Sequence, residues 1–284
     1  NSLVAAAHQF HYKEVKKGTK NPDKVPEEEK EHYLLAGYPW FKVRARDTFI
    51  SLPGLTLAVN EEDYFKAAMK TAEKGLYEFM LGKPLTVSIY EIEQPDVMLW
   101  AVWAIQQYAK KVGLETAVGD YGKLVTDIIT YIEGGKHFNI ELRDNGLLHT
   151  EGRDKPMTWM NSMANGKPVV PRTGFVVEIN ALWYNALKFF VEIASLRNDQ
   201  NAVAHYEGLA QKVRTSFQQT FITPAGYLFD YKEDGIEDWN VRPNQIFAVA
   251  LDYSPLETAQ QKAVLDFCTR ELLTPKGLRS LSPK

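Results

Sequence analysis

Several carboxylates of this chain have a position and spacing that suit catalysis or ligand binding. They stand at the starts of apolar helical segments, and aromatic side chains follow about a turn later. Asp47 follows Arg46 at the start of one such segment, Asp96 stands before Trp100, and Glu178 opens a third. Such a carboxylate can simply cap the helix or interact with its dipole. Plain capping therefore explains each instance alone, whereas several in successive helical hairpins would indicate a site. A fourth segment leads polar groups into an apolar helix through Trp239, Arg242, Asn244 and Gln245.

The stretch before Glu178 is too irregular for one secondary-structure element. Residues 146–177 mix glycine, proline and polar side chains with aromatic ones. Long loops of this kind in compact domains usually carry a binding site or a lid. This loop would deliver Trp159, Asn161 and Arg172 to the start of the helix that bears Glu178. A plain surface loop remains the alternative.

Other kinds of catalytic chemistry find little support in the sequence. The six histidines form no ligand-spaced pair apart from His8 and His11, so we expect no metal site. There is no Gly-x-Ser-x-Gly motif, and Cys268, the only cysteine, fits a core position better than a nucleophile. Carboxylate chemistry among aromatic side chains remains, which is how glycosidases work.

The composition excludes some classes of binding partner and favours one cellular compartment. The chain has 284 residues and a net charge of -3, which gives no basic field for nucleic acid. Aromatic residues make up 12% of it, and exposed aromatic rings are good platforms for sugars. A single cysteine gives no support for an oxidising compartment, and no apolar run is long enough to span a bilayer. We therefore expect an intracellular protein that needs no cofactor, binds no membrane and acts on a neutral, polar ligand.

The hydrophobic periodicity predicts an all-α fold with a few short strands in the loops. We expect a short helix near residues 3–10, a solvated insertion over 13–32, Pro53 as a kink, Asn60 as a helix N-cap and a short strand over 226–231. Short turns alternate with long, decorated loops, which suggests a closed ring of helical hairpins with one functional rim. The predicted helical segments are 47–60, 60–80, 95–112, 117–134, 178–198, 200–221, 243–253 and 256–273.

Several motifs together resemble one family. The chain is similar, nearly end to end, to the C-terminal amylo-α-1,6-glucosidase domain of glycogen debranching enzymes. The resemblance implies a single (α/α)6 toroid over residues 1–284, a cytoplasmic location and inverting hydrolysis of the α-1,6-linked glucose of a glycogen limit dextrin. It also implies a glucanotransferase or other domain in the full-length chain. The motifs are Ala36–Phe41, Arg46–Thr48, Thr158–Met160, Pro171–Arg172, Glu178–Leu187 and Arg242–Gln245.

The resemblance also implies roles for individual residues. Arg46 and Asp47 would bind hydroxyl groups of the terminal glucose, and Asp96 and Trp100 would line the same subsite. Trp159 would stack against the sugar. The remaining polar wall would consist of Glu178, Arg242, Asn244 and Gln245.

The chain departs from the family pattern at the position of the general acid. Asn161 stands where the family has an Asp directly after Thr-Trp-Met. An amide has no proton to give at ordinary pH, so it cannot act as the acid. Either Glu151 or Asp154 in the same loop substitutes for it, or the protein hydrolyses poorly. The family also commonly has Trp-Gly where this chain has Arg44-Ala45.

A further departure is that the family pattern continues into more helices after the segment Leu278–Pro283. The catalytic base is expected in that further part, so we expect the ring of hairpins to be incomplete at its C-terminal end.

Three functions remain open. The leading one is an exo-acting α-1,6-glucosidase. The second is a non-hydrolytic α-glucan-binding module that has lost its acid at Asn161. The third is a related hydrolase of the same fold, such as a trehalase-like enzyme, which acts on a different α-glucoside.

Overall fold

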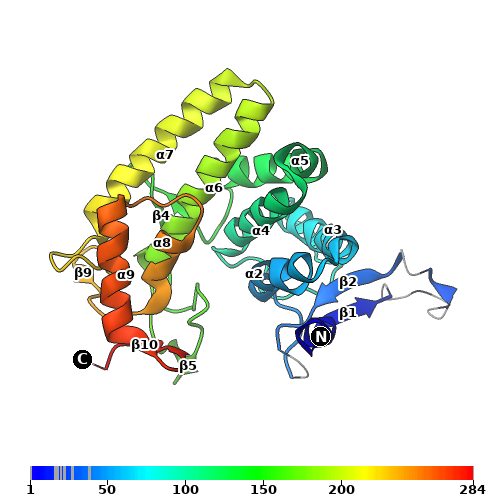
Figure 1. Cartoon of the computed structure of the whole chain (residues 1–284), viewed down its shortest axis with the longest axis horizontal. Coiled ribbons are helices and arrows are strands. Elements are labelled where there is room, and N and C mark those ends of the chain that lie inside the picture. Colours follow the sequence, from blue (N-terminus) through cyan, green and yellow to red (C-terminus); the bar gives the residue numbers. More distant parts are fainter. Residues whose placement is uncertain are drawn as a thin grey trace. The chain divides into compact units, whose positions relative to one another are not determined.

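The computed structural model describes residues 2–15, 19, 21, 24–26, 29–37 and 40–283, and it divides the chain into two compact units (Figure 1). The N-terminal unit is Asn1–Leu124 and the C-terminal unit is Val125–Lys284. Tyr38 and Pro39 of the aromatic motif, and parts of the predicted insertion, lie outside the described residues. In the described part of the chain, no helix is long and apolar enough to cross a membrane.

The N-terminal unit is built on helices whose apolar stripes form its core. Phe65 and Tyr108 stack there, with their ring centroids 4.8 Å apart. Asn60 is not the N-cap of the next helix: it is the left-handed C-cap (φ 63°) of a 3-10 helix, and Glu61 precedes the α-helix that begins at Glu62. The helices are α1 Ser2–His8, α2 Ala45–Leu55, η3 Leu57–Val59, α3 Glu62–Met80, α4 Val97–Val112 and the first part of α5 Leu114–Glu133.

The predicted insertion near residue 13 contains two paired strands. β1 (His11–Glu14) runs antiparallel to β2 (Glu31–Leu34). Tyr33 and Leu34 are buried, and the Tyr33 hydroxyl donates a hydrogen bond of 2.7 Å to Glu31. The prediction of a solvated segment over 13–32 is wrong at its last two residues, because Glu31 and His32 lie in β2 and Glu31 is buried. Lysines and glutamates dominate the composition there, but Glu31 is held inside by hydrogen bonds from Tyr33 and Lys74.

The C-terminal unit is centred on α6 (Val177–Leu196), which packs against α7 (Gln200–Phe221) as an antiparallel hairpin (Figure 1). Most of α6 is buried, as its nearly continuous apolar sequence requires. Its buried amides hold neighbouring loops: Asn180 accepts from the Leu148 N–H at 2.7 Å, and Asn185 accepts from the Tyr253 N–H at 3.1 Å. The helix predicted over 243–253 is shorter and divided into η4 Pro243–Ile246 and α8 Phe247–Ala250, and α9 spans Thr258–Leu272.

Short strands connect these helices. A five-stranded antiparallel sheet has the order β3-β4-β7-β8-β9, with β3 Glu141–Leu142, β4 Leu148–Thr150, β7 Gly174–Val176, β8 Tyr231–Glu233 and β9 Ile236–Glu237. The strand expected over 226–231 therefore begins only at its last residue. Two hairpins complete the unit: β5 Met163–Ala164 with β6 Lys167–Pro168, and β10 Leu273–Thr274 with β11 Gly277–Leu278. The expectation of an all-α fold with short strands in its loops is confirmed.

The loop before β7 lies against the loop after β4 with no room for a side chain. A Cβ atom at Gly152 would lie 1.8 Å from the carbonyl oxygen of Arg172. We predict that Gly152→Ala lowers the free energy of unfolding by about 1–3 kcal/mol or more, because the two backbones must separate. Urea unfolding measures the effect.

The matched control is Gly208→Ala on α7, where a Cβ meets nothing within 4 Å. That change removes a flexible residue from a helix and is expected to stabilise by up to about 1 kcal/mol. Equal losses in both variants would contradict the close approach at Gly152.

The loop after α5 contains a buried histidine whose pKa is lowered. Burial lowers the pKa of His137 from 6.5 to about 4. Between these values the unfolded chain binds a proton that the folded one excludes, so stability falls as pH drops through this window. We predict that His137→Gln removes roughly 3 kcal/mol of the stability lost between about pH 7 and pH 4.

The measurement compares urea unfolding of the parent and the variant across this pH range. The difference between them isolates His137 from the carboxylates that titrate nearby. Parallel pH profiles would contradict the burial of a neutral imidazole.

Candidate functional site

A buried ionic network in the C-terminal unit joins residues that are far apart in the sequence. Its hub is Asp230, which directly precedes β8 and is 2% exposed. One carboxylate oxygen accepts from Nε of Arg172 at 2.8 Å and from Nη1 of Arg242 at 3.0 Å. The other accepts from the side-chain amide of Asn244 at 2.7 Å. Asp230 therefore connects the loop before β7 to η4.

Arg172 also binds Glu178 in the first turn of α6. The two terminal nitrogens of the guanidinium each donate to one Glu178 oxygen, so the contact is bidentate. Burial raises the pKa of Glu178, and the positive charge of Arg172 opposes this shift. Buried charges are tolerated only when they are paired and hydrogen-bonded, and here the guanidinium satisfies both carboxylates.

The network continues to Asp238 through Arg242. The same Nη1 of Arg242 that contacts Asp230 lies 3.0 Å from a carboxylate oxygen of Asp238. Gln245 shapes the turn around this arginine: its side chain accepts from the Leu228 N–H at 3.0 Å and donates to the Arg242 carbonyl at 3.1 Å. Gln245 is buried, and these two hydrogen bonds hold the loop in place.

At its outer end the network holds Trp159. The indole N–H donates a hydrogen bond of 2.8 Å to the side-chain oxygen of Asn244, while 41% of the Trp159 surface stays exposed. The amide of Asn244 also lies 3.5 Å from the sulfur of Met160. Asn161 follows directly and is half-buried. An exposed indole with a fixed orientation is a suitable surface on which a sugar ring can stack.

Glu151 and Asp154 line a different hollow. Together with His149 they border a cavity of about 350 Å³. The Thr173 hydroxyl donates a hydrogen bond of 3.2 Å to Glu151, whose side chain is 66% exposed, and Asp154 is also exposed. The structure brings these two carboxylates together, but Asn161 does not line this cavity.

In the N-terminal unit, Arg46 and Asp96 form a second bidentate pair. Nε of Arg46 donates to Asp96 at 2.6 Å and Nη2 at 2.8 Å, and both side chains are buried. Burial opposes the charge of Arg46, but Asp96 outweighs it and raises the pKa of the guanidinium. The indole N–H of Trp100 donates to the same carboxylate at 3.2 Å, and Trp100 is 4% exposed. Trp100 therefore packs inside this unit.

The capping alternative does not describe these carboxylates. Asp96 stands at the N-cap position of α4, yet its side chain accepts no capping hydrogen bond. Arg44, rather than Asp47, precedes the first turn of α2, and Val176 precedes that of α6. Asp47 is half-buried in the first turn of its helix.

Sequence reasoning missed the hub of the network. Asp230 and Asp238 were not among the predicted site residues, although both contact Arg242. The available signal was an aspartate within the apolar run Leu228–Tyr231, a place where a carboxylate needs a buried partner. Within the described residues, no group of three or more His, Cys, Asp or Glu side chains could hold a metal ion.

The helical hairpins place the chain in the all-α fold class. Its polar network lies at one end of α6. The family model described as amylo-α-1,6-glucosidase matches residues 5–284, so the chain belongs to the amylo-α-1,6-glucosidase family, whose members are glycoside hydrolases.

Two comparisons add to this assignment. The glycogen debranching enzyme of Saccharomyces cerevisiae is 24% identical over 189 residues, which covers 52% of this chain and 12% of the yeast enzyme. The crystal structure of a sugar epimerase from a ruminal bacterium superposes with a TM-score of 0.52 at 11% identity, over 84% of this chain and 62% of that one. The epimerase supports the fold alone.

Removal of the hub charge tests the network. We predict that Asp230→Asn lowers the free energy of unfolding by about 3–5 kcal/mol, because two buried guanidinium groups lose a charged partner. The control is Asp266→Asn, which removes an exposed ion pair with Lys262 and should cost less than about 1 kcal/mol. Urea unfolding compares the two, and similar small losses would show that Asp230 is not the hub.

Proposed function

We propose that this domain is an exo-acting amylo-α-1,6-glucosidase that removes the glucose left at a trimmed branch point of glycogen. The observation that carries the proposal is the exposed indole of Trp159, which the buried network fixes next to the acid position. A ring that is ordered before binding loses little entropy when a sugar stacks on it. Membership of the amylo-α-1,6-glucosidase family supports the substrate class.

The full-length protein would be a cytoplasmic enzyme with a glucanotransferase or another domain beside this one. The yeast enzyme supports the proposal of a further domain, since the matching segment takes up 12% of its length. Arg46, Asp47 and Asp96 are proposed to contribute to glucose binding. Arg46 and Asp96 form a bidentate pair, and its charge-assisted hydrogen bonds fix the geometry of both side chains.

Hydrolysis by inversion needs one carboxylic acid at the leaving oxygen and one carboxylate that activates water. Because Asn161 cannot donate the proton, Glu151 or Asp154 is the proposed substitute. Both are exposed and share one cavity with His149, so a sugar oxygen could reach either of them.

Asn161 itself favours a second function. An amide in place of the acid would leave a glucan-binding module that retains Trp159 and the network but releases no glucose. Such a module would place a neighbouring catalytic domain on its substrate.

Glucose release from phosphorylase limit dextrin by the full-length protein separates the two functions. We predict release by the unaltered protein, and a loss of about 100-fold or more with whichever of Glu151→Gln and Asp154→Asn removes the acid. The other carboxamide variant is the matched control.

Asn161→Asp is assayed beside them. If the parent is silent and this variant is active, the binding-module function replaces the proposal. If both are silent on limit dextrin but release glucose from another α-glucoside such as trehalose, the substrate assignment is wrong.

A further inference from the structure

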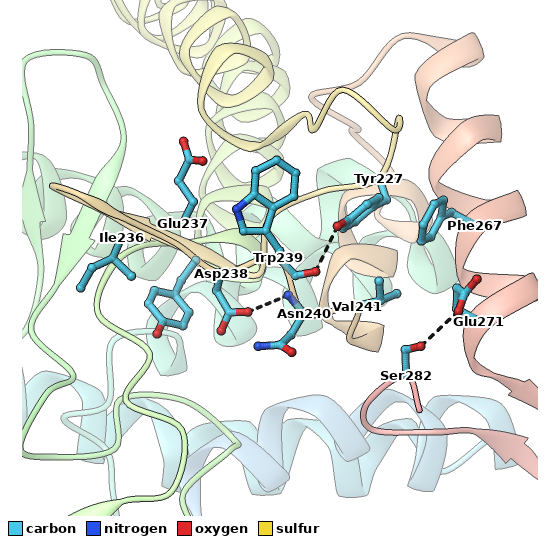
Figure 2. A pocket seen from close by; sticks show the side chains of 11 residues that line it. Tyr227, Ile236, Glu237, Asp238, Trp239, Asn240, Val241, Phe267, Glu271 and Ser282 are labelled. Atoms are coloured by element: carbon cyan, nitrogen blue, oxygen red, sulfur yellow. Dashed lines mark hydrogen bonds between the residues drawn. The ribbon is translucent and has the colours of Figure 1, made fainter. Parts of the chain in front are cut away.

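A cavity of about 680 Å³ lies beside Asp238, at the edge of the network. The Asp238 carboxylate is already paired with Arg242 at 3.0 Å. The indole of Trp239 lies on the opposite side of its segment from the side chains of Asp238 and Asn240 (Figure 2), so one ligand cannot contact all three. The charge and the aromatic ring of this cavity therefore indicate no common ligand.

A cavity of a different character lies in the N-terminal unit, where β2 meets α3 (Figure 1). Its volume of about 590 Å³ is within the range of small-molecule sites. The N–H of His32 on β2 donates a hydrogen bond of 3.0 Å to the hydroxyl of Thr71 on α3, and both residues line the cavity. None of the lining residues is among those assigned to the sugar, so an inference from this cavity does not depend on the proposed function.

Positive charge predominates around this cavity. Lys66, Lys70 and Lys74 are spaced four residues apart on α3. They therefore lie along one face of the helix, and each step rises about 6 Å along its axis. Four lysines line the cavity against two glutamates, although the whole chain has a net charge of -3. The charged lining residues are Lys30, Lys66, Lys70, Lys74, Glu29 and Glu31.

The central lysine of this row has no carboxylate partner. Lys74 donates to Glu31 at 2.9 Å, and Lys66 lies 3.2 Å from Asp120. Lys70 lies between them and forms no ion pair with any residue that the structure describes. Like charges four residues apart on a helix repel each other, so an anion at Lys70 would relieve a repulsion that the chain leaves uncompensated.

The rest of the lining indicates that the anion carries an organic group. An ammonium group is a compact point charge that commonly binds phosphate. A phosphate ion alone would fill only part of the cavity, whose other walls include Val15, Val25 and Ala67. The hydrocarbon stems of the lysines add to this apolar surface. Lys66 and Lys70 are exposed, so the basic side of the cavity is open to a ligand from solvent.

We propose that this cavity binds a small phosphate monoester. Its phosphate group contacts the ammonium group of Lys70, and its organic part packs against Val15, Val25 and Ala67. Glu31 does not compete for Lys70, because its carboxylate is buried and accepts hydrogen bonds from Lys74 and from the hydroxyl of Tyr33.

The experiment titrates the full-length protein into glycerol 3-phosphate and, separately, into inorganic phosphate. Broadening of the ³¹P resonance measures the affinity, and the ionic strength is held constant because salt screens exposed charges. We expect the ester to bind more tightly than inorganic phosphate, since only the ester reaches the apolar walls. Lys70→Gln should weaken the affinity for the ester by roughly fivefold or more, because the phosphate loses its nearest positive charge.

Two further variants complete the test. Glu29→Gln removes an exposed carboxylate from the lining and should strengthen the affinity by roughly twofold or more. Lys212→Gln is the matched control: it removes the same charge from an exposed position on α7 that does not line the cavity. Its affinity should equal that of the parent.

Absence of binding, or equal losses in Lys70→Gln and Lys212→Gln, overturns the inference. An ester that binds no more tightly than inorganic phosphate overturns the assignment to a monoester. Glucose release from limit dextrin is assayed beside the titrations. Because Lys70 is not among the residues assigned to the sugar, either result leaves the test of the proposed function unchanged.

Discussion

The burial of one guanidinium group constrains most of the C-terminal unit. The side chain of Arg172 is 1% exposed, and a charge in that position is tolerated only with complete pairing. Glu178 pairs with one edge of the group and Asp230 with another, so α6, the loop before β7 and the start of β8 must meet at one point. The backbone carbonyl of Arg172 lies against Gly152, which fixes the loop on its other side as well. Local propensities cannot produce this arrangement, because each element depends on the others for its neutralising partner.

The network also connects buried ion pairs to an aromatic ring at the surface. It begins at Glu178, where water is excluded, and ends at Trp159, whose ring is partly open to solvent. Between them, Asn244 has no charge but uses its amide on Asp230 and its oxygen on the indole. A stacking surface is thus attached to a rigid ionic base, although it lies in a long loop. Such support by buried residues is what preorganises a binding site.

The sequence allowed the helices and most members of the network to be predicted, but not its centre, Asp230. Glu178 and Arg172 belong to recognisable motifs, and the periodicity of α3, α6 and α7 located these helices to within a few residues. Asp230 was not predicted because its partners lie 58 residues before it and 12 and 14 residues after it in the sequence. Pairing over such separations leaves no periodic signal in the sequence. The strand predicted over 226–231 begins later in the structure for a related reason. Apolar and polar side chains alternate there, but Leu228 forms only an isolated β-bridge.

The two arginine–carboxylate pairs show why similar patterns can lead to different roles. Arg46 and Asp96 form a bidentate pair, and Trp100 donates its indole N–H to the same carboxylate, so this tryptophan is directed inward and buried. In the C-terminal unit the carboxylate contacts arginines and an asparagine, and the indole of Trp159 binds that asparagine at the outer edge instead. In the C-terminal unit one polar residue, Asn244, therefore lies between the buried charge and the exposed ring. The pattern of a carboxylate followed by aromatic residues leads to a buried ring in both units, since Trp100 after Asp96 and Trp183 after Glu178 both lie in the core. The exposed Trp159 precedes Glu178 in the chain, so the contact with Asn244, and not that pattern, places its ring at the surface.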